Sequence, residues 1–121
     1  MNEQDFLLRI ITCFALSFCI GLERQWRRRT IGLRTNVLVS IGAFLFVATG
    51  IDRTGDVTRI PAQVVSGIGF LGAGVILRDG ANIKGLNTAA TLWCNAAIGV
   101  MTATGLLLEA AIGTVFILIS N

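Results

Sequence analysis

Residues 62–99 read AQVVSGIGFLGAGVILRDGANIKGLNTAATLWCNAAIG, and this stretch decides the fold. It contains two apolar runs rich in Gly, Ala, Ser and Thr, joined by a short loop that carries charged residues. Both runs are too apolar for a solvated surface and too rich in small residues for a helix that faces only lipid. Small residues at helical spacing let transmembrane helices approach closely. We therefore expect this stretch to form the packed centre of a small polytopic membrane protein.

The composition of the whole chain agrees with a membrane location. Of its 121 residues, 54% are apolar and only 14% are charged, and the mean hydropathy is +0.76. Charged residues are about 25% of an ordinary soluble domain. Five apolar runs follow one another, at residues 6–22, 36–51, 60–77, 88–103 and 106–120. None alternates with a period of two, so the sequence predicts an all-α domain, a bundle of five transmembrane helices.

The basic residues predict how these helices are oriented. Most of the ten Lys and Arg residues lie in the first and third loops, namely Arg24, Arg27, Arg28, Arg29, Arg34, Arg78 and Lys84. Loops rich in Lys and Arg remain in the cytoplasm, so we expect the N-terminus outside and the C-terminus in the cytoplasm. Because Arg24 and residues 27–29 directly follow a predicted span, we expect them to contact anionic lipid headgroups rather than nucleic acid.

Several kinds of chemistry find no support in the sequence. Histidine is absent, and the three cysteines lie inside apolar runs without forming a CxxC pair, so we expect Cys13 and Cys19 to be packing residues. The segment GIGFLG at residues 67–72 matches a dinucleotide-binding pattern. It lies in an unbroken apolar run, however, whereas that pattern requires a preceding strand. We predict no catalytic residue, metal or cofactor, and hence no enzyme.

Two predicted helices each have a face of small and polar residues, at about 100° per residue. The third helix groups Gln63, Ser66, Gly67, Phe70, Ala73 and Gly74. The fourth groups Thr88, Thr91, Asn95, Gly99 and Thr102. We expect both faces to turn inward, so that Gly67→Leu or Gly74→Leu overpacks the contact and Ile68→Leu, towards lipid, is nearly silent. The faces either bond helices together or line a pathway for an ion or solute.

Three further positions carry specific expectations. Arg9 and Glu109 lie at a similar depth inside the first and fifth spans, where a lone charge is costly, so we expect them to form an ion pair. Asn87 precedes the predicted fourth helix and is expected to cap it. Cys94 borders the polar face of that helix.

Five sequence blocks occur in the order of a known family. They are GLERQWR at 21–27, GLRT at 32–35, PAQVVSGIGFLGAGVILRDG at 61–80, GLNTAATLWC at 85–94 and AAIG at 96–99. Together they resemble the membrane domain of the MgtC/SapB family, in its MgtC branch. The resemblance extends from about Ile20 to the C-terminus.

The resemblance implies a bacterial inner-membrane protein that supports growth in low magnesium and survival inside macrophages. It also implies lateral contacts with membrane partners such as ATP synthase or small membrane peptides, and it does not imply magnesium transport. Asn87 and Cys94 match family positions that are sensitive to substitution, and Asp79 stands where the family usually has Glu. Members of this branch usually continue into a soluble ACT-like domain, which we expect to be absent here.

Two functions from different classes follow. The first is a non-enzymatic regulatory protein that acts through lateral contacts with lipids, other membrane proteins or a second copy of itself, and not with nucleic acid. The second is a small transporter or channel whose pathway is lined by the polar faces of the third and fourth helices. Flux through proteoliposomes separates the two, because a regulator without its partner should show none.

Overall fold

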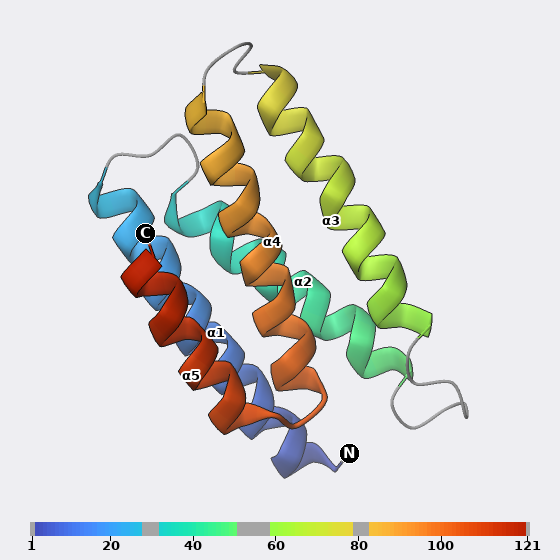
Figure 1. Ribbon diagram of the computed structural model, residues 1–121. Helices are drawn as coiled ribbons and strands as arrows, with labels where there is room; N and C mark the ends of the chain where they lie inside the picture. The colour runs from blue at the N-terminus through green and yellow to red at the C-terminus, as the bar shows by residue number, and fades with distance from the viewer. Residues whose placement is uncertain (1, 28–31, 51–58, 79–82, 121) are drawn as a thin grey trace.

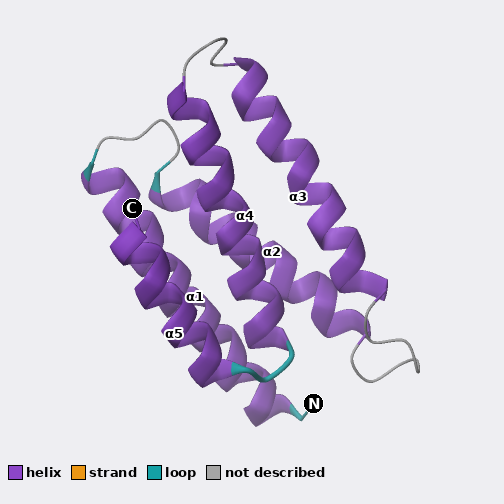
Figure 2. Ribbon diagram, viewed as in Figure 1, coloured by secondary structure: helices purple, strands orange, loops and turns teal. Residues whose placement is uncertain are grey.

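The computed structural model describes residues 2–27, 32–50, 59–78 and 83–120, except for the side chains of 74–78 and 83–85. These residues form α1 (Glu3–Trp26), α2 (Leu33–Gly50), α3 (Arg59–Arg78), α4 (Ile83–Ala103) and α5 (Leu107–Ser120) (Figure 1). Figure 2 shows no strand in the described part of the chain. The all-α fold is as predicted. Several helices are longer than the apolar runs, since polar residues at their ends continue the helix.

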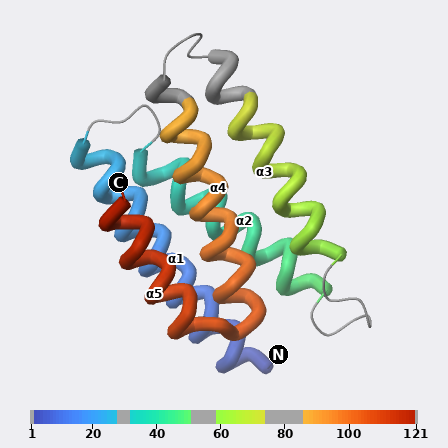
Figure 3. Tube along the Cα trace, in the orientation of Figure 1, coloured from blue at the N-terminus to red at the C-terminus, as the bar shows by residue number. Residues whose placement is uncertain are grey.

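α4 lies at the centre of the bundle. It packs against all four other helices, with α1 and α5 on one side and α3 on the other, while α2 crosses behind it (Figures 1 and 3). Among the described residues, α3 contacts only α4 and α2, so it forms one edge of the bundle. Among the described residues, α4 is thus the helix that contacts every other helix.

Among the described glycines, Gly99 has the least space for a side chain, at the point where α4 crosses α2. A Cβ atom added at Gly99 would overlap the carbonyl oxygen of Ser40 and lie 2.9 Å from Cβ of Ala43. Only a residue without a side chain fits at this crossing. Small residues allow backbones to meet in this way in lipid, where the hydrophobic effect contributes little to helix association.

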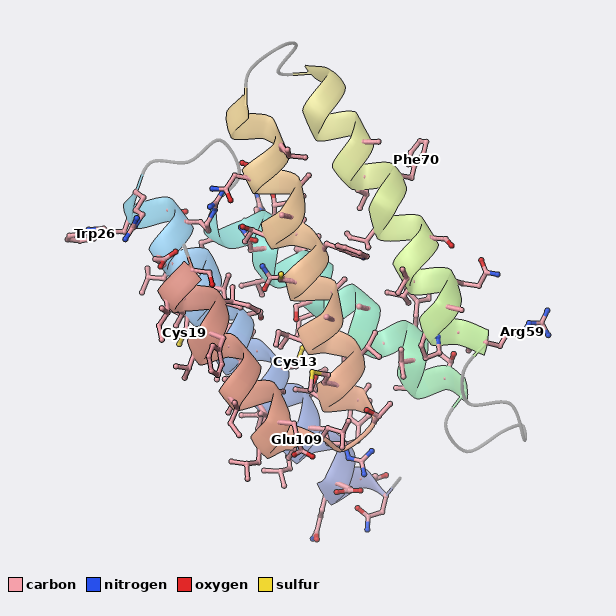
Figure 4. The ribbon with its side chains drawn as sticks, viewed as in Figure 1. Cys13, Cys19, Trp26, Arg59, Phe70 and Glu109 are labelled. Atoms are coloured by element: carbon pink, nitrogen blue, oxygen red, sulfur yellow. The ribbon has the colours of Figure 1, made fainter. Side chains whose placement is uncertain are left out.

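The inner faces of α1 and α2 follow the same spacing of three and four residues. On α1 the buried residues are Cys13, Ser17, Ile20, Gly21 and Arg24. On α2 they are Asn36, Ser40, Ala43, Phe44 and Val47. Cys13 lies between these helices (Figure 4), with its Sγ atom 3.3 Å from Oγ of Ser40. Cys13 is thus a packing residue, as predicted, whereas Cys19 is exposed.

The orientation of α3 differs from the sequence expectation. Ile68 is buried in a cluster with Ala43, Leu92 and Ala96, and a Cβ at Gly72 would lie 3.3 Å from that of Ala89. The predicted inward face is instead exposed, at Gln63, Ser66, Gly67, Phe70 and Ala73. Figure 4 shows Phe70 pointing away from the bundle. The reason is that Ile68 fills the space between α2 and α4, and Gly72 provides the close contact.

These placements also correct the two substitutions expected for α3. A Cβ at Gly67 would meet no atom within 4 Å, so a larger residue there does not overpack the bundle. Ile68 is 7% exposed, so it is a core residue and not a lipid-facing one. Gly74 lies in the part of α3 whose surroundings are not described.

Arg9 joins α1 to the end of α4 and does not pair with Glu109. Its Nη1 donates to the carbonyl oxygen of Ala103 at 2.9 Å, and its Nη2 lies 3.0 Å from Oδ2 of Asp5. Among the described residues these are the polar contacts of Arg9, and Glu109 is exposed. The predicted pair is therefore wrong. The last carbonyls of a helix carry partial negative charge, and here they attract the guanidinium group instead.

The outer surface of the bundle is apolar around most of its circumference. Leu8 is 57% exposed, Phe70 79% and Phe116 66%. α1 and α2 are long and apolar enough to cross a membrane. At about 1.5 Å per residue, the 24 residues of α1 exceed a hydrocarbon core of about 30 Å. A surface of this kind is too apolar for water and is expected of a protein in lipid.

Candidate functional site

Five polar residues meet where α1, α2 and α4 come together, and we call them the buried polar cluster: Arg24, Asn36, Thr88, Thr91 and Asn95. Each is at most 4% exposed. Their burial in an apolar bundle requires hydrogen-bond partners, because each polar group left without one in hydrocarbon costs several kcal/mol.

Arg24 supplies the charge of this cluster. It is 1% exposed, and its Nη2 donates to Oγ1 of Thr88 on α4 at 3.1 Å. The expectation that Arg24 contacts lipid headgroups is therefore wrong. It fails because α1 continues to Trp26, which places Arg24 on the inward face one turn beyond Ile20. Arg27 is exposed, and Arg28 and Arg29 lie outside the described residues.

An amide pair links α2 to α4 inside the cluster. Nδ2 of Asn95 donates to Oδ1 of Asn36 at 2.6 Å, and Nδ2 of Asn36 donates to the carbonyl oxygen of Gly32 at 2.7 Å. Oδ1 of Asn95 is buried and accepts no hydrogen bond from the described residues. The inward face of α4, including Gly99 and Thr102, is thus used mainly for bonding and packing between helices.

The two polar faces do not line a common pathway in the described part of the chain. The face of α4 turns towards α1 and α2, whereas the described residues of the corresponding face of α3 are exposed and do not turn towards α4. A channel between these two faces therefore has no counterpart in the described arrangement of helices.

A pocket lies next to the cluster, between α4 and α5. It has a volume of about 260 Å³ and is lined by Asn87, Ala90, Thr91, Cys94, Phe116, Ile117 and Ser120. Thr91 belongs to both features, and its hydroxyl donates to the backbone oxygen of Asn87 at 3.1 Å. We call this feature the α4–α5 pocket.

Asn87 and Cys94, the two positions emphasised by the family resemblance, both line this pocket. They are seven residues apart, so two helical turns place them on the same side of α4. Because α4 begins at Ile83, Asn87 lies in its second turn and is not the helix cap that the sequence led us to expect. Cys94 is a half-buried free thiol.

The described residues contain no group of three His, Cys, Asp or Glu side chains that could hold a metal ion. The polar atoms at the pocket are an amide, hydroxyl groups and one thiol. These groups can form hydrogen bonds and close van der Waals contacts with a partner.

The model of the MgtC family matches residues 10–121, nearly the whole chain. The chain belongs to the MgtC family. Among curated relatives, protein MgtC of Brucella abortus is 56% identical over 89% of this chain and 46% of its own length. Protein MgtC of Salmonella typhimurium is 51% identical over 96% of this chain and 51% of its own length. An uncharacterized protein of Synechocystis is 53% identical over 100% of this chain and 53% of its own length.

The chain therefore spans about half the length of the curated relatives that it matches. No solved structure matches it. The matched region contains both the buried polar cluster and the α4–α5 pocket, so both features belong to the part shared with the family. Asp79, the third position emphasised by the resemblance, lies outside the described residues.

Sequence reasoning did not predict the hydrogen bonds of the buried polar cluster, nor that Asn87 and Cys94 line one pocket. The signal for Arg24 was its spacing from Ile20 and Ser17, which continues one helix face beyond the apolar run. Asn36 and Ser40 show the same spacing on α2. The pocket could have been anticipated from Asn87, Ala90 and Cys94, which follow the spacing of one side of a helix.

Proposed function

We propose that this MgtC-family chain is a non-enzymatic regulatory protein of the bacterial inner membrane. It acts through lateral contacts of α4 with other membrane proteins or small membrane peptides, ATP synthase being one such partner. Through these contacts it supports growth in low magnesium and survival inside macrophages. The observation that carries the proposal is the α4–α5 pocket, which presents Asn87 and Cys94 together at the surface of the bundle.

The size and chemistry of the pocket favour a helix as the partner. Its volume of about 260 Å³ is below the roughly 300–1,000 Å³ of typical small-molecule sites. It is large enough for a side chain from a neighbouring helix, and Ala90 in its wall lets that helix come near. Small residues at such contacts are typical of helix association in membranes.

The membrane location is supported by the apolar surface and by the residues at the ends of the helices. Trp26 is 85% exposed at the end of α1, and both Trp26 and Arg59 point away from the bundle (Figure 4). Trp and Arg are common at the boundary between lipid and water. The distribution of basic residues orients the chain with its N-terminus outside and its C-terminus in the cytoplasm.

The proposal is tested by growth of a bacterium that lacks its own MgtC-family gene and expresses this chain. Cys94→Ala and Asn87→Ala should leave the amount of protein in the membrane unchanged, because neither side chain is part of the closely packed interior. Both should reduce growth in low magnesium. Cys19→Ala is the matched control, since Cys19 is an exposed thiol on α1 and does not line the pocket.

Growth of the Cys94→Ala strain equal to that of the parent would make Cys94 a packing residue only. Purified protein in proteoliposomes provides a second measurement. A regulator that acts on a partner should show no magnesium flux by itself, whereas flux abolished by changes in the buried polar cluster would favour a transporter.

A further inference from the structure

A long groove runs between α2 and α3, on the side of the bundle away from α5. Its volume is about 750 Å³, and its walls are lined by Thr35, Leu38, Val39, Gly42, Ala43, Phe46, Thr49, Ile60, Gln63, Val64, Gly67, Ile68, Leu71 and Ala96. Only Thr35, Thr49 and Gln63 among these are polar. The groove reaches inward as far as Ala96 on α4, so it separates α2 from α3 over much of their length.

The groove narrows at one end to a contact between α2 and α3. At this narrow end α2 and α3 touch, because a Cβ added at Gly50 would lie 2.7 Å from Cδ1 of Ile60. From this contact the two helices diverge (Figure 1). The space between them persists because two of the lining residues are glycines. A Cβ at Gly42 or at Gly67 would meet no atom within 4 Å.

A positive charge without a partner among the described residues lies near the other end of the groove. Arg34 is in the first turn of α2, one turn from Leu38 on the same side of the helix. It is exposed, and it forms no ion pair or hydrogen bond with any described residue. The sequence analysis expected Arg24, and not Arg34, to contact lipid headgroups. In the structure Arg24 is buried and Arg34 is exposed.

We propose that the groove binds an anionic phospholipid, with an acyl chain along α2 and α3 and the phosphate at Arg34. A helix is about 10–12 Å wide with its side chains, so it cannot follow the groove to the point where α2 and α3 touch. A single acyl chain can. The charge of Arg34 complements a phosphate at the end of the groove away from the contact of Gly50 with Ile60, where a lipid headgroup would lie. The inference depends on the membrane location and not on the regulatory role.

The test compares two glycines of α3 that are equally free of neighbours. Gly67 lines the groove, whereas Gly69 does not, and a Cβ at either position has open space. The full chain is reconstituted in nanodiscs containing equal amounts of phosphatidylglycerol and phosphatidylcholine, and bound lipid is measured by native mass spectrometry after release into detergent. We expect Gly67→Leu to lose the retained lipid and Gly69→Leu to keep it.

Gly42→Leu, on the opposite wall, should lose the lipid as Gly67→Leu does, and it replaces that variant if Gly67→Leu does not fold. Circular dichroism identifies the folded variants.

Arg34→Gln should keep bound lipid but lower the preference for phosphatidylglycerol about five-fold, the change expected for one basic residue at a membrane surface. Arg59→Gln is its control, because Arg59 is exposed at the start of α3, next to the contact of Gly50 with Ile60.

Equal lipid retention by the Gly67 and Gly69 variants would overturn the proposal. So would an equal effect of Arg34→Gln and Arg59→Gln on lipid preference. A dimer that is present in the parent protein and lost specifically in Gly67→Leu would assign the groove to a second copy of the chain instead.

Discussion

Glycine 99 is the residue on which the packing of α2 against α4 depends most directly. Its missing side chain allows the two backbones to meet at Ser40, and any Cβ would displace α2. Other glycines have no such role. At Gly113 on α5 the nearest atom to an added Cβ is 3.9 Å away, an ordinary contact. The effect of a glycine substitution should therefore depend on what lies opposite it.

Gly99→Ala should lower the free energy of unfolding by about 1–3 kcal/mol, the usual cost of forcing an extra carbon atom into a packed interior. Gly113→Ala should not destabilise the bundle, because the added methyl group fits and alanine favours a helix over glycine. Unfolding of the purified variants in detergent, followed by circular dichroism, measures both changes. Equal effects at the two positions would contradict the described crossing of α2 and α4.

The amide pair of Asn36 and Asn95 permits a second test on single residues. Changing both to Ala should cost less than the sum of the two single changes, because each single change leaves a buried amide without its partner. A coupling of about 0.6 kcal/mol, and at most roughly 1.7 kcal/mol, is expected for a hydrogen bond between membrane helices. A double-mutant cycle measures it, and strictly additive costs would show that the pair does not stabilise the bundle.

Arg24 illustrates what could and could not be predicted for a single residue. Its charge and its place after an apolar run predicted an exposed position in a loop. Its spacing from Ile20, which the sequence analysis did not use, continues the buried face of α1 and would have been the better guide. The partner, Thr88, is 64 positions away in the chain. Such a partner could not be inferred without knowing that α1 and α4 are neighbours.

At the scale of helices, the apolar runs predicted the five elements, but they did not predict the orientation of α3. In a membrane protein both sides of a helix can be apolar, so hydrophobicity does not distinguish the inner side from the outer. The inward face of α4 was easier to predict, since Thr91 and Asn95 need polar partners inside the bundle. The small residues of α3 lacked this constraint, and its inner side is determined by how Ile68 fits between α2 and α4.

The connection between α4 and α5 gives a prediction at this scale. Gly105, with a φ angle of 89°, ends α4, and Arg9 binds the carbonyl oxygen of Ala103 beside it. Arg9→Gln should lower the free energy of unfolding by about 1.5–3 kcal/mol, the range for a hydrogen bond to a charged group. Glu109→Gln should have little effect and should add independently to Arg9→Gln. Thermal unfolding of the single and double variants tests this, and coupling between the two changes would restore the pair predicted from sequence.

At the scale of the whole molecule, the central position of α4 links the interior of the bundle to its surface. One side of α4 carries the buried polar cluster, and an adjacent side carries the α4–α5 pocket, with Thr91 in both. A partner that contacts the pocket would thus lie next to the bonds that join α4 to α1 and α2. This arrangement depends on contacts between distant helices, which is why the family resemblance could emphasise Asn87 and Cys94 without revealing that both line one pocket.

The most direct test of the proposed function is photo-crosslinking in living cells grown in low magnesium. A photoreactive amino acid replaces Ala90, which is exposed in the wall of the α4–α5 pocket, or Phe14, which is exposed on α1. We predict a crosslinked adduct with a membrane protein or peptide at position 90, its loss when Cys94→Ala is also present, and no such adduct at position 14. Equal adducts at both positions, or an adduct at position 90 that is unchanged by Cys94→Ala, would contradict the account.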